Sequence, residues 1–278
     1  MISMPAILEY DFMRRAFVVG VFLAFIIPCV GIIVVLKRLS MIGDALSHTS
    51  LAGVSAGLIM SINPVLGSVI ACVIAALGIE VIRKKIPRYA EMSIAIMMSA
   101  GVGLAGVLSG FVKNSANFNS FLFGSIVAIS NFEMMMVIFI SCAVMLTFFF
   151  LYKELFYIAL DERAARLAGI PVKTINFVFT ILTAVTVSIA ARTVGALIVS
   201  SLMVIPVACA MQFGKSYKQT VIYSVCFAVF FMLAGLYISY YQRLKPGGTI
   251  VLIGVICLVI ILIIKSILSG IVSSRNKL

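Results

Sequence analysis

Apolar runs of about 20 residues, separated by short polar stretches, repeat along the whole chain. A helix of about that length crosses the hydrocarbon core of a bilayer. The pattern predicts nine membrane-crossing helices, at residues 17–36, 45–60, 64–82, 93–112, 134–152, 174–191, 194–213, 221–241 and 249–264. Residues 118–129 are apolar but too short to cross, which is typical of a re-entrant segment.

The composition supports the same interpretation. Of 278 residues, 63% are hydrophobic and 11% are charged, and the mean hydropathy is +1.25. Soluble domains carry about 45–50% apolar and about 25% charged residues, so a soluble enzyme, a disordered chain and a disulfide-stapled secreted domain are excluded. We expect an all-α fold, a polytopic transmembrane helical bundle with eight or nine spans. Residues 1–278 then form a single transmembrane domain with no room for a large soluble domain.

Basic residues outnumber acidic residues by 21 to 9, which gives a formal net charge of +12. They lie between the apolar runs, so the positive-inside rule explains them better than binding to nucleic acid does. Alternation of the nine spans places 15 of the 21 basic residues on one side and 6 on the other. We therefore expect the N-terminus outside the cell and the C-terminus in the cytoplasm.

One glycine motif looks like a dinucleotide site but lacks the required context. Residues 101–106 match G-x-G-x-x-G, yet no strand precedes them and they lie inside an apolar run. Small residues at such spacing favour close packing of membrane helices. Gly106 and Gly110, and separately Gly53 and Gly57, have the same G-x-x-x-G spacing.

Catalytic motifs are rejected on similar grounds. Residues 214–216 read Gly-Lys-Ser, but the upstream glycine of a phosphate-binding loop is replaced by Cys209. A single histidine cannot form the H-E-x-x-H pair of an intramembrane metalloprotease. The chain is therefore not expected to be an enzyme, and any ATP hydrolysis is expected on a separate ATPase chain.

A polar pair stands at the start of the second predicted span. Asp44 and His48 are four residues apart, so a helix places them on one face. A carboxylate at membrane depth costs about 2.5–3.5 kcal/mol on insertion scales and usually faces a bundle interior or a pathway. Carboxylate and imidazole together suit Mn²⁺, Zn²⁺ or Fe²⁺. An equally acceptable interpretation from the chemistry alone is a packed Asp–His hydrogen bond near a helix start.

Residues 154–172 form the longest mixed polar segment. Asp161 and Glu162 suit a helix start, Ala165 belongs to a surface of small side chains, and Gly169 ends the helix before Pro171. Such a helix suits docking into a groove on a cytoplasmic partner. An ordinary interfacial loop helix explains the same residues.

The order and spacing of several segments resemble the permease subunits of the bacterial ABC-type zinc, manganese and iron uptake family, over nearly the whole chain. The segments are Gly-Asp-Ala-Leu-Ser-His at 43–48, Ser-Phe-Leu-Phe-Gly at 120–124, the stretch 161–172, the stretches 194–199 and 205–208, Ser-Tyr-Tyr at 239–241, and 246–252.

The resemblance implies a type II ABC importer-like permease that forms a homodimeric pore in the bacterial plasma membrane. Its partners would be cytosolic ABC ATPase subunits and an extracellular or periplasmic metal-binding protein, with no resident cofactor and a divalent metal (Zn, Mn or Fe) as substrate. Asp44 and His48 match the family's metal pathway. Asp161, Glu162, Ala165 and Gly169 fall in its ATPase-coupling helix. The alternative is a secondary metal carrier or channel that works alone.

One segment departs from the family pattern. Similar proteins often carry an acidic residue after Ser-Tyr-Tyr, whereas this chain has Gln242 and Arg243. An additional extracellular carboxylate for metal entry is therefore not expected here.

Overall fold

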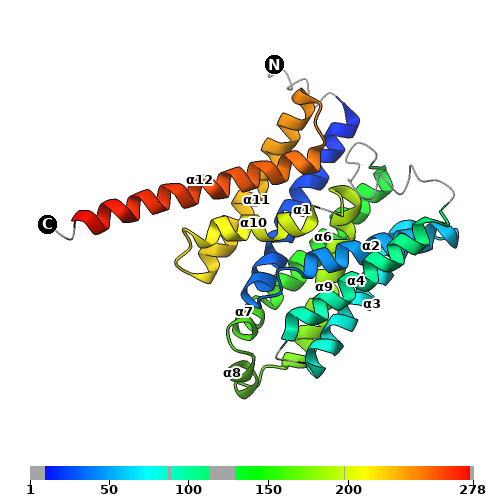
Figure 1. Cartoon of the computed structure of the whole chain (residues 1–278), viewed down its shortest axis with the longest axis horizontal. Helices are drawn as coiled ribbons and strands as arrows, with labels where there is room; N and C mark the ends of the chain where they lie inside the picture. The colour runs from blue at the N-terminus through cyan, green and yellow to red at the C-terminus, as the bar shows by residue number, and fades with distance from the viewer. Residues whose placement is uncertain (1–9, 87–88, 113–128, 197, 276–278) are drawn as a thin grey trace.

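The computed structural model describes residues 10–86, 89–112, 129–196 and 198–275. These residues form helices joined by short turns (Figure 1). In chain order the helices are α1 (Asp11–Leu36), α2 (Ile42–Ile59), α3 (Pro64–Lys85), α4 (Ala90–Ser109), α6 (Asn131–Phe150), α7 (Tyr152–Leu160), α8 (Glu162–Leu167), α9 (Val172–Thr193), α10 (Val199–Met211), α11 (Tyr217–Gln242) and α12 (Pro246–Arg275).

Most of the predicted spans are confirmed. Within the described residues, seven helices are long and apolar enough to cross a membrane, namely α1, α3, α4, α6, α9, α11 and α12. The other two predicted spans are helical but fall outside this set, so by length and composition the predicted count of eight or nine is slightly too high. The helix α2 is too polar because it carries Asp44, His48 and several hydroxyls, and α10 has only 13 residues. The proposed re-entrant segment lies, except for its last residue, outside the described residues.

Two local features of the backbone explain why some helix ends differ from those predicted from the sequence. Gly195 adopts a φ of 110°, in the region that favours glycine, so the predicted span at 194–213 becomes helical only at Val199. The predicted helix at 154–172 is divided in two, because Asp161 has an extended backbone and caps a new helix, α8. As predicted, the chain leaves the helical conformation before Pro171, with Gly169 at a φ of 82°.

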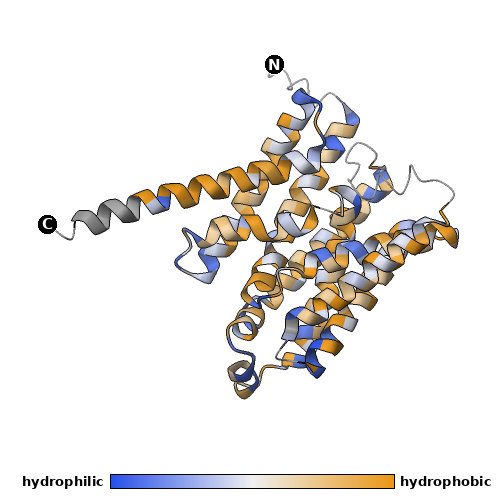
Figure 2. Ribbon diagram, in the orientation of Figure 1, coloured by the Kyte–Doolittle hydropathy of each residue, from blue (hydrophilic) through white to orange (hydrophobic). Residues whose placement is uncertain are grey.

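Contacts between distant residues show which helix ends lie together at each of the two ends of the bundle. At one end, called here the basic end, Lys37 after α1 donates a hydrogen bond to Asn176 near the start of α9. Leu36, Phe156 and Lys215 line one cavity there. At the opposite end, the guanidinium of Arg15 donates to the carbonyl of Ile129, just before α6. Hydrophilic residues concentrate at both ends of the bundle, as Figure 2 shows.

The helices differ in how much of their surface the bundle covers. The helix α2 is buried over most of its length against α3, α4, α9 and α10. By contrast, α12 contacts α10 and α11 and projects away from the remaining helices (Figure 1). The polar helix therefore lies inside the bundle, and the more apolar helix lies at its edge.

Candidate metal pathway and coupling helix

Asp44 and His48 lie in the first two turns of α2, which is helical as predicted, so the two side chains share one face. Both residues are half-buried, whereas Ala45, Leu46 and Ser47 between them are buried. Asp44 lies in the first turn, where the positive end of the helix dipole stabilises a carboxylate. In the described parts of the chain, neither side chain makes a hydrogen bond or an ion pair. The packed Asp–His hydrogen bond is therefore not seen.

Close backbone contacts hold α2 against its neighbours. The α-carbon of Ser200 in α10 lies 3.1 Å from where a Cβ on Gly43 would stand. A Cβ on Gly53 would collide with the carbonyl of Gly67 in α3. The predicted role of Gly53 and Gly57 in helix packing is thus confirmed, since Gly57 also approaches Pro64.

The glycines of α4 behave differently from that prediction. A Cβ on Gly101 would lie 2.6 Å from the hydroxyl of Thr49, so Gly101 is a close contact between α4 and α2. A Cβ on Gly103 or Gly106 would meet nothing within 4 Å, and one on Gly110 would meet only its own helix. Within the described chain, the packing role predicted for Gly106 and Gly110 is therefore not confirmed.

A buried chain of hydroxyls fixes α2 to α3 and α9. The hydroxyls of Ser50 and Ser68 lie 2.7 Å apart, and those of Ser68 and Ser188 lie 2.6 Å apart. Beside them, the thiol of Cys72 donates to the carbonyl of Leu46. Side-chain hydrogen bonds of this kind hold helices together where no water competes. The part of α2 that follows His48 is thus a fixed element of the bundle.

The geometry supplies two metal donors, one carboxylate and one imidazole. Among the described residues, no group of three or more His, Cys, Asp and Glu side chains comes close enough together to hold a metal ion. A two-donor site with an open side binds a metal incompletely, because first-row ions take four or more ligands.

At the basic end, Asp161 caps α8 rather than standing free on it. Its Oδ1 accepts hydrogen bonds from the backbone N–H of Arg163 at 2.8 Å and of Ala164 at 3.1 Å. The bonds from Ala164 and Arg163 hold the pKa of Asp161 below its usual value. Glu162 pairs with Arg166 one turn on, at 3.3 Å and exposed.

The α8 surface is divided between an inner and an outer side. Ala165 is buried, whereas Leu167 is 90% exposed. Gly169 has open space around it and follows the helix in a left-handed conformation. An exposed leucine on a short capped helix is the kind of anchor that inserts into a groove on a partner.

Two polar contacts that join distant parts of the chain were not predicted from the sequence. The carboxylate of Glu133 accepts from the guanidinium of Arg192 at the opposite end, with a shortest distance of 2.9 Å. At the basic end, Lys37 Nζ lies 2.6 Å from Asn176 Oδ1. The available signals were a Ser130–Glu133 capping box and a single amide, Asn176, within an apolar run.

Comparison with known proteins gives a consistent result. Residues 9–265 match the model of the ABC 3 transport family. The chain is 34% identical to a probable metal transport system membrane protein of Treponema pallidum, over 92% of this chain and 96% of that protein. It is 30% identical to the manganese transport system membrane protein MntC of Listeria monocytogenes, over 92% and 91% of the two chains.

The fold also resembles a solved structure. The chain superposes on PsaBC from Streptococcus pneumoniae, solved in complex with Fab, with a TM-score of 0.82 and 25% identity. The match covers 92% of each chain.

Proposed function

Because the chain belongs to the ABC 3 transport family, we propose that it is the membrane-spanning permease subunit of an ATP-driven importer of divalent metal ions. The observation that carries this proposal is the half-buried pair Asp44 and His48 on a polar helix fixed inside an apolar bundle. The names of the Treponema and Listeria relatives support metal as the cargo, and the second supports manganese. Zinc and iron suit the same two donors.

We infer that Asp44 and His48 form part of the pathway and that other ligands complete the coordination of the ion. A second copy of the chain is the natural source of these ligands. In the first two turns of α2, Asp44 and His48 lie on the face that the bundle leaves partly uncovered, next to the exposed Met41. A homodimer would bring two such pairs towards one axis. Four donors would then meet the requirement of a first-row ion.

The basic end is proposed to face the cytoplasm. The positive-inside rule favours this orientation, since Lys37, Arg83 and Lys215 gather there with the basic residues of α7 and α8. It places α8 where a cytosolic ATPase can reach it. The opposite end would then receive the ion from an extracellular or periplasmic metal-binding protein.

Dependence on ATP separates the importer from a carrier or channel that works alone. The complete complex, in vesicles loaded with ATP, is expected to accumulate radioactive Mn²⁺ or Zn²⁺, and vesicles with a non-hydrolysable analogue are not. Equal accumulation without ATP, or by this chain alone, would establish the stand-alone carrier instead.

The docking role of α8 is tested by its most exposed side chain. Leu167→Asp should weaken binding of the ATPase by at least about tenfold, because it places a charge at an apolar anchor. Leu160→Asp is the matched control, because Leu160 is also exposed (62%) but ends α7 and lies outside α8. Co-purification of the ATPase at wild-type levels with Leu167→Asp would show that α8 is not the dock.

A further inference from the structure

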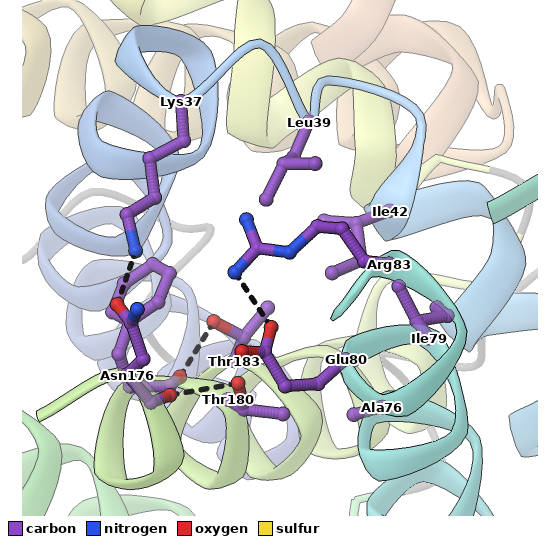
Figure 3. A pocket seen from close by; sticks show the side chains of 11 residues that line it. Lys37, Leu39, Ile42, Ala76, Ile79, Glu80, Arg83, Asn176, Thr180 and Thr183 are labelled. Atoms are coloured by element: carbon purple, nitrogen blue, oxygen red, sulfur yellow. Dashed lines mark hydrogen bonds and ion pairs between the residues drawn. The ribbon is translucent and has the colours of Figure 1, made fainter. Parts of the chain in front are cut away.

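Lys37 ties the end of α1 to the start of α9. Its ammonium donates to Oδ1 of Asn176 at 2.6 Å and lies 5.4 Å from the centre of the Phe179 ring. Asn176 is buried, with 3% of its surface exposed. Figure 3 shows the Lys37 side chain extending from its turn to Asn176, across from the Glu80–Arg83 pair.

The turn that follows Lys37 is a rigid connection to α2, the helix that carries Asp44 and His48. The N–H of Leu39 donates to the carbonyl of Val34, the N–H of Arg38 donates to that of Val35, and Arg38 is left-handed with a φ of 57°. These two bonds define a Schellman motif, which fixes the direction of the chain after a helix. The N–H of Ile42 then bonds to Leu39, and α2 begins. A displacement of Lys37 is therefore passed to α2 rather than absorbed by a loop.

On the other side of the contact, backbone hydrogen bonds join α8 closely to the start of α9. Only residues 168–171 separate the two helices. The N–H of Ile170 donates back to Ala165 in α8, and the N–H of Ile175 donates to Pro171. Asn176 is the next residue along α9, one turn from the link.

The environment of Lys37 makes this contact exchangeable rather than permanent. Burial, and to a smaller extent the nearby charge of Arg83, lower the pKa of Lys37 to about 8, while Glu162 and Glu80 oppose that shift. In this conformation the ammonium of Lys37 bonds to the neutral amide of Asn176. The carboxylates of Glu162 on α8 and Glu80 on α3 also attract it. A small cavity of about 20 Å³, room for one water molecule, adjoins it. A shift of α8 can therefore alter the balance between these partners.

We propose that the Lys37–Asn176 contact carries displacements of α8 into α2, so that both are positioning residues that couple the ATPase to the Asp44–His48 pair. This inference rests on the proposed function. It adds a specific path, from α8 through the start of α9 and the α1–α2 turn, that involves no contact with the metal itself.

The test measures metal ions transported per ATP hydrolysed, in vesicles that contain the complete complex. Lys37→Met keeps the length of the side chain without its donor, and Asn176→Leu keeps the volume without the acceptor. Each should lower the ratio at least about fivefold, the smaller end of known coupling effects, while ATP hydrolysis continues. The double variant should be no worse than either single variant, because both remove one interaction.

Two further variants exclude a merely structural role. Asn176→Gln retains a neutral amide acceptor and should retain the wild-type ratio. Lys218→Met removes an exposed lysine at the start of α11, at the same end of the bundle, and should also leave the ratio unchanged. An unchanged ratio in Lys37→Met and Asn176→Leu would overturn the proposal, as would an equal loss of transport, hydrolysis and assembly. Failure of the wild-type complex to transport metal with ATP would instead refute the proposed function.

Discussion

The helices α2 and α12 differ in polarity and in how much of their surface the bundle covers. The helix α2 has 18 residues, carries hydroxyls, an acid and an imidazole, and is buried over most of its surface. In α12, only 11% of the most apolar stretch is buried, and its large exposed apolar side chains are leucine, isoleucine and valine. Apolar side chains gain nothing by leaving lipid, so the polar helix takes the interior and is held by close packing and hydrogen bonds.

This contrast predicts the largest change in stability where α2 meets α3. Gly53→Ala would place a methyl group against the carbonyl of Gly67 and against Ala71, at a cost of about 1–3 kcal/mol. Gly103→Ala in α4 is the matched control, because its methyl group would meet nothing within 4 Å. Unfolding of the purified protein by titration with dodecyl sulfate measures both. Equal stability of the two variants would contradict the tight α2–α3 contact.

The next prediction compares the loss of stability when one side chain is shortened on each of the two helices. Leu46 of α2 is fully buried, and Leu46→Ala should cost about 2 kcal/mol, near the lower end of the range for soluble cores, because only packing is lost when lipid is the alternative. Ile260 of α12 is half exposed, and Ile260→Ala should change stability by less than about 0.5 kcal/mol. The same titration distinguishes them. A loss of similar size at Ile260 would mean that α12 is covered by protein rather than by lipid.

The apolar pattern was sufficient to locate the bundle helices, since runs such as that of α3 need only length and composition to be recognised. It also pointed to Asp44 and His48 as candidate pathway residues, because ionisable residues in an apolar run are conspicuous. It failed where one residue changes the backbone, as when Asp161 separates α7 from α8 and Gly195 delays α10.

Contacts between distant residues were beyond the sequence alone. Lys37 and Asn176 are 139 positions apart, and Glu133 and Arg192 are 59 apart. Which polar side chain meets which depends on how whole helices pack, and no local pattern records that. The serine chain of α2, α3 and α9 is a further example, because Ser68 and Ser188 are 120 positions apart.

The central claim is that the polar face of α2 conducts the metal. Its most direct test is uptake of radioactive Mn²⁺ or Zn²⁺ by ATP-loaded vesicles that contain the complete complex with Asp44→Ala or His48→Ala. The control is Asp11→Ala, which removes an exposed acid at the start of α1. Both α2 variants are predicted to assemble normally and lose uptake, while the control transports at the wild-type rate. Normal uptake by the Asp44 and His48 variants would contradict the account.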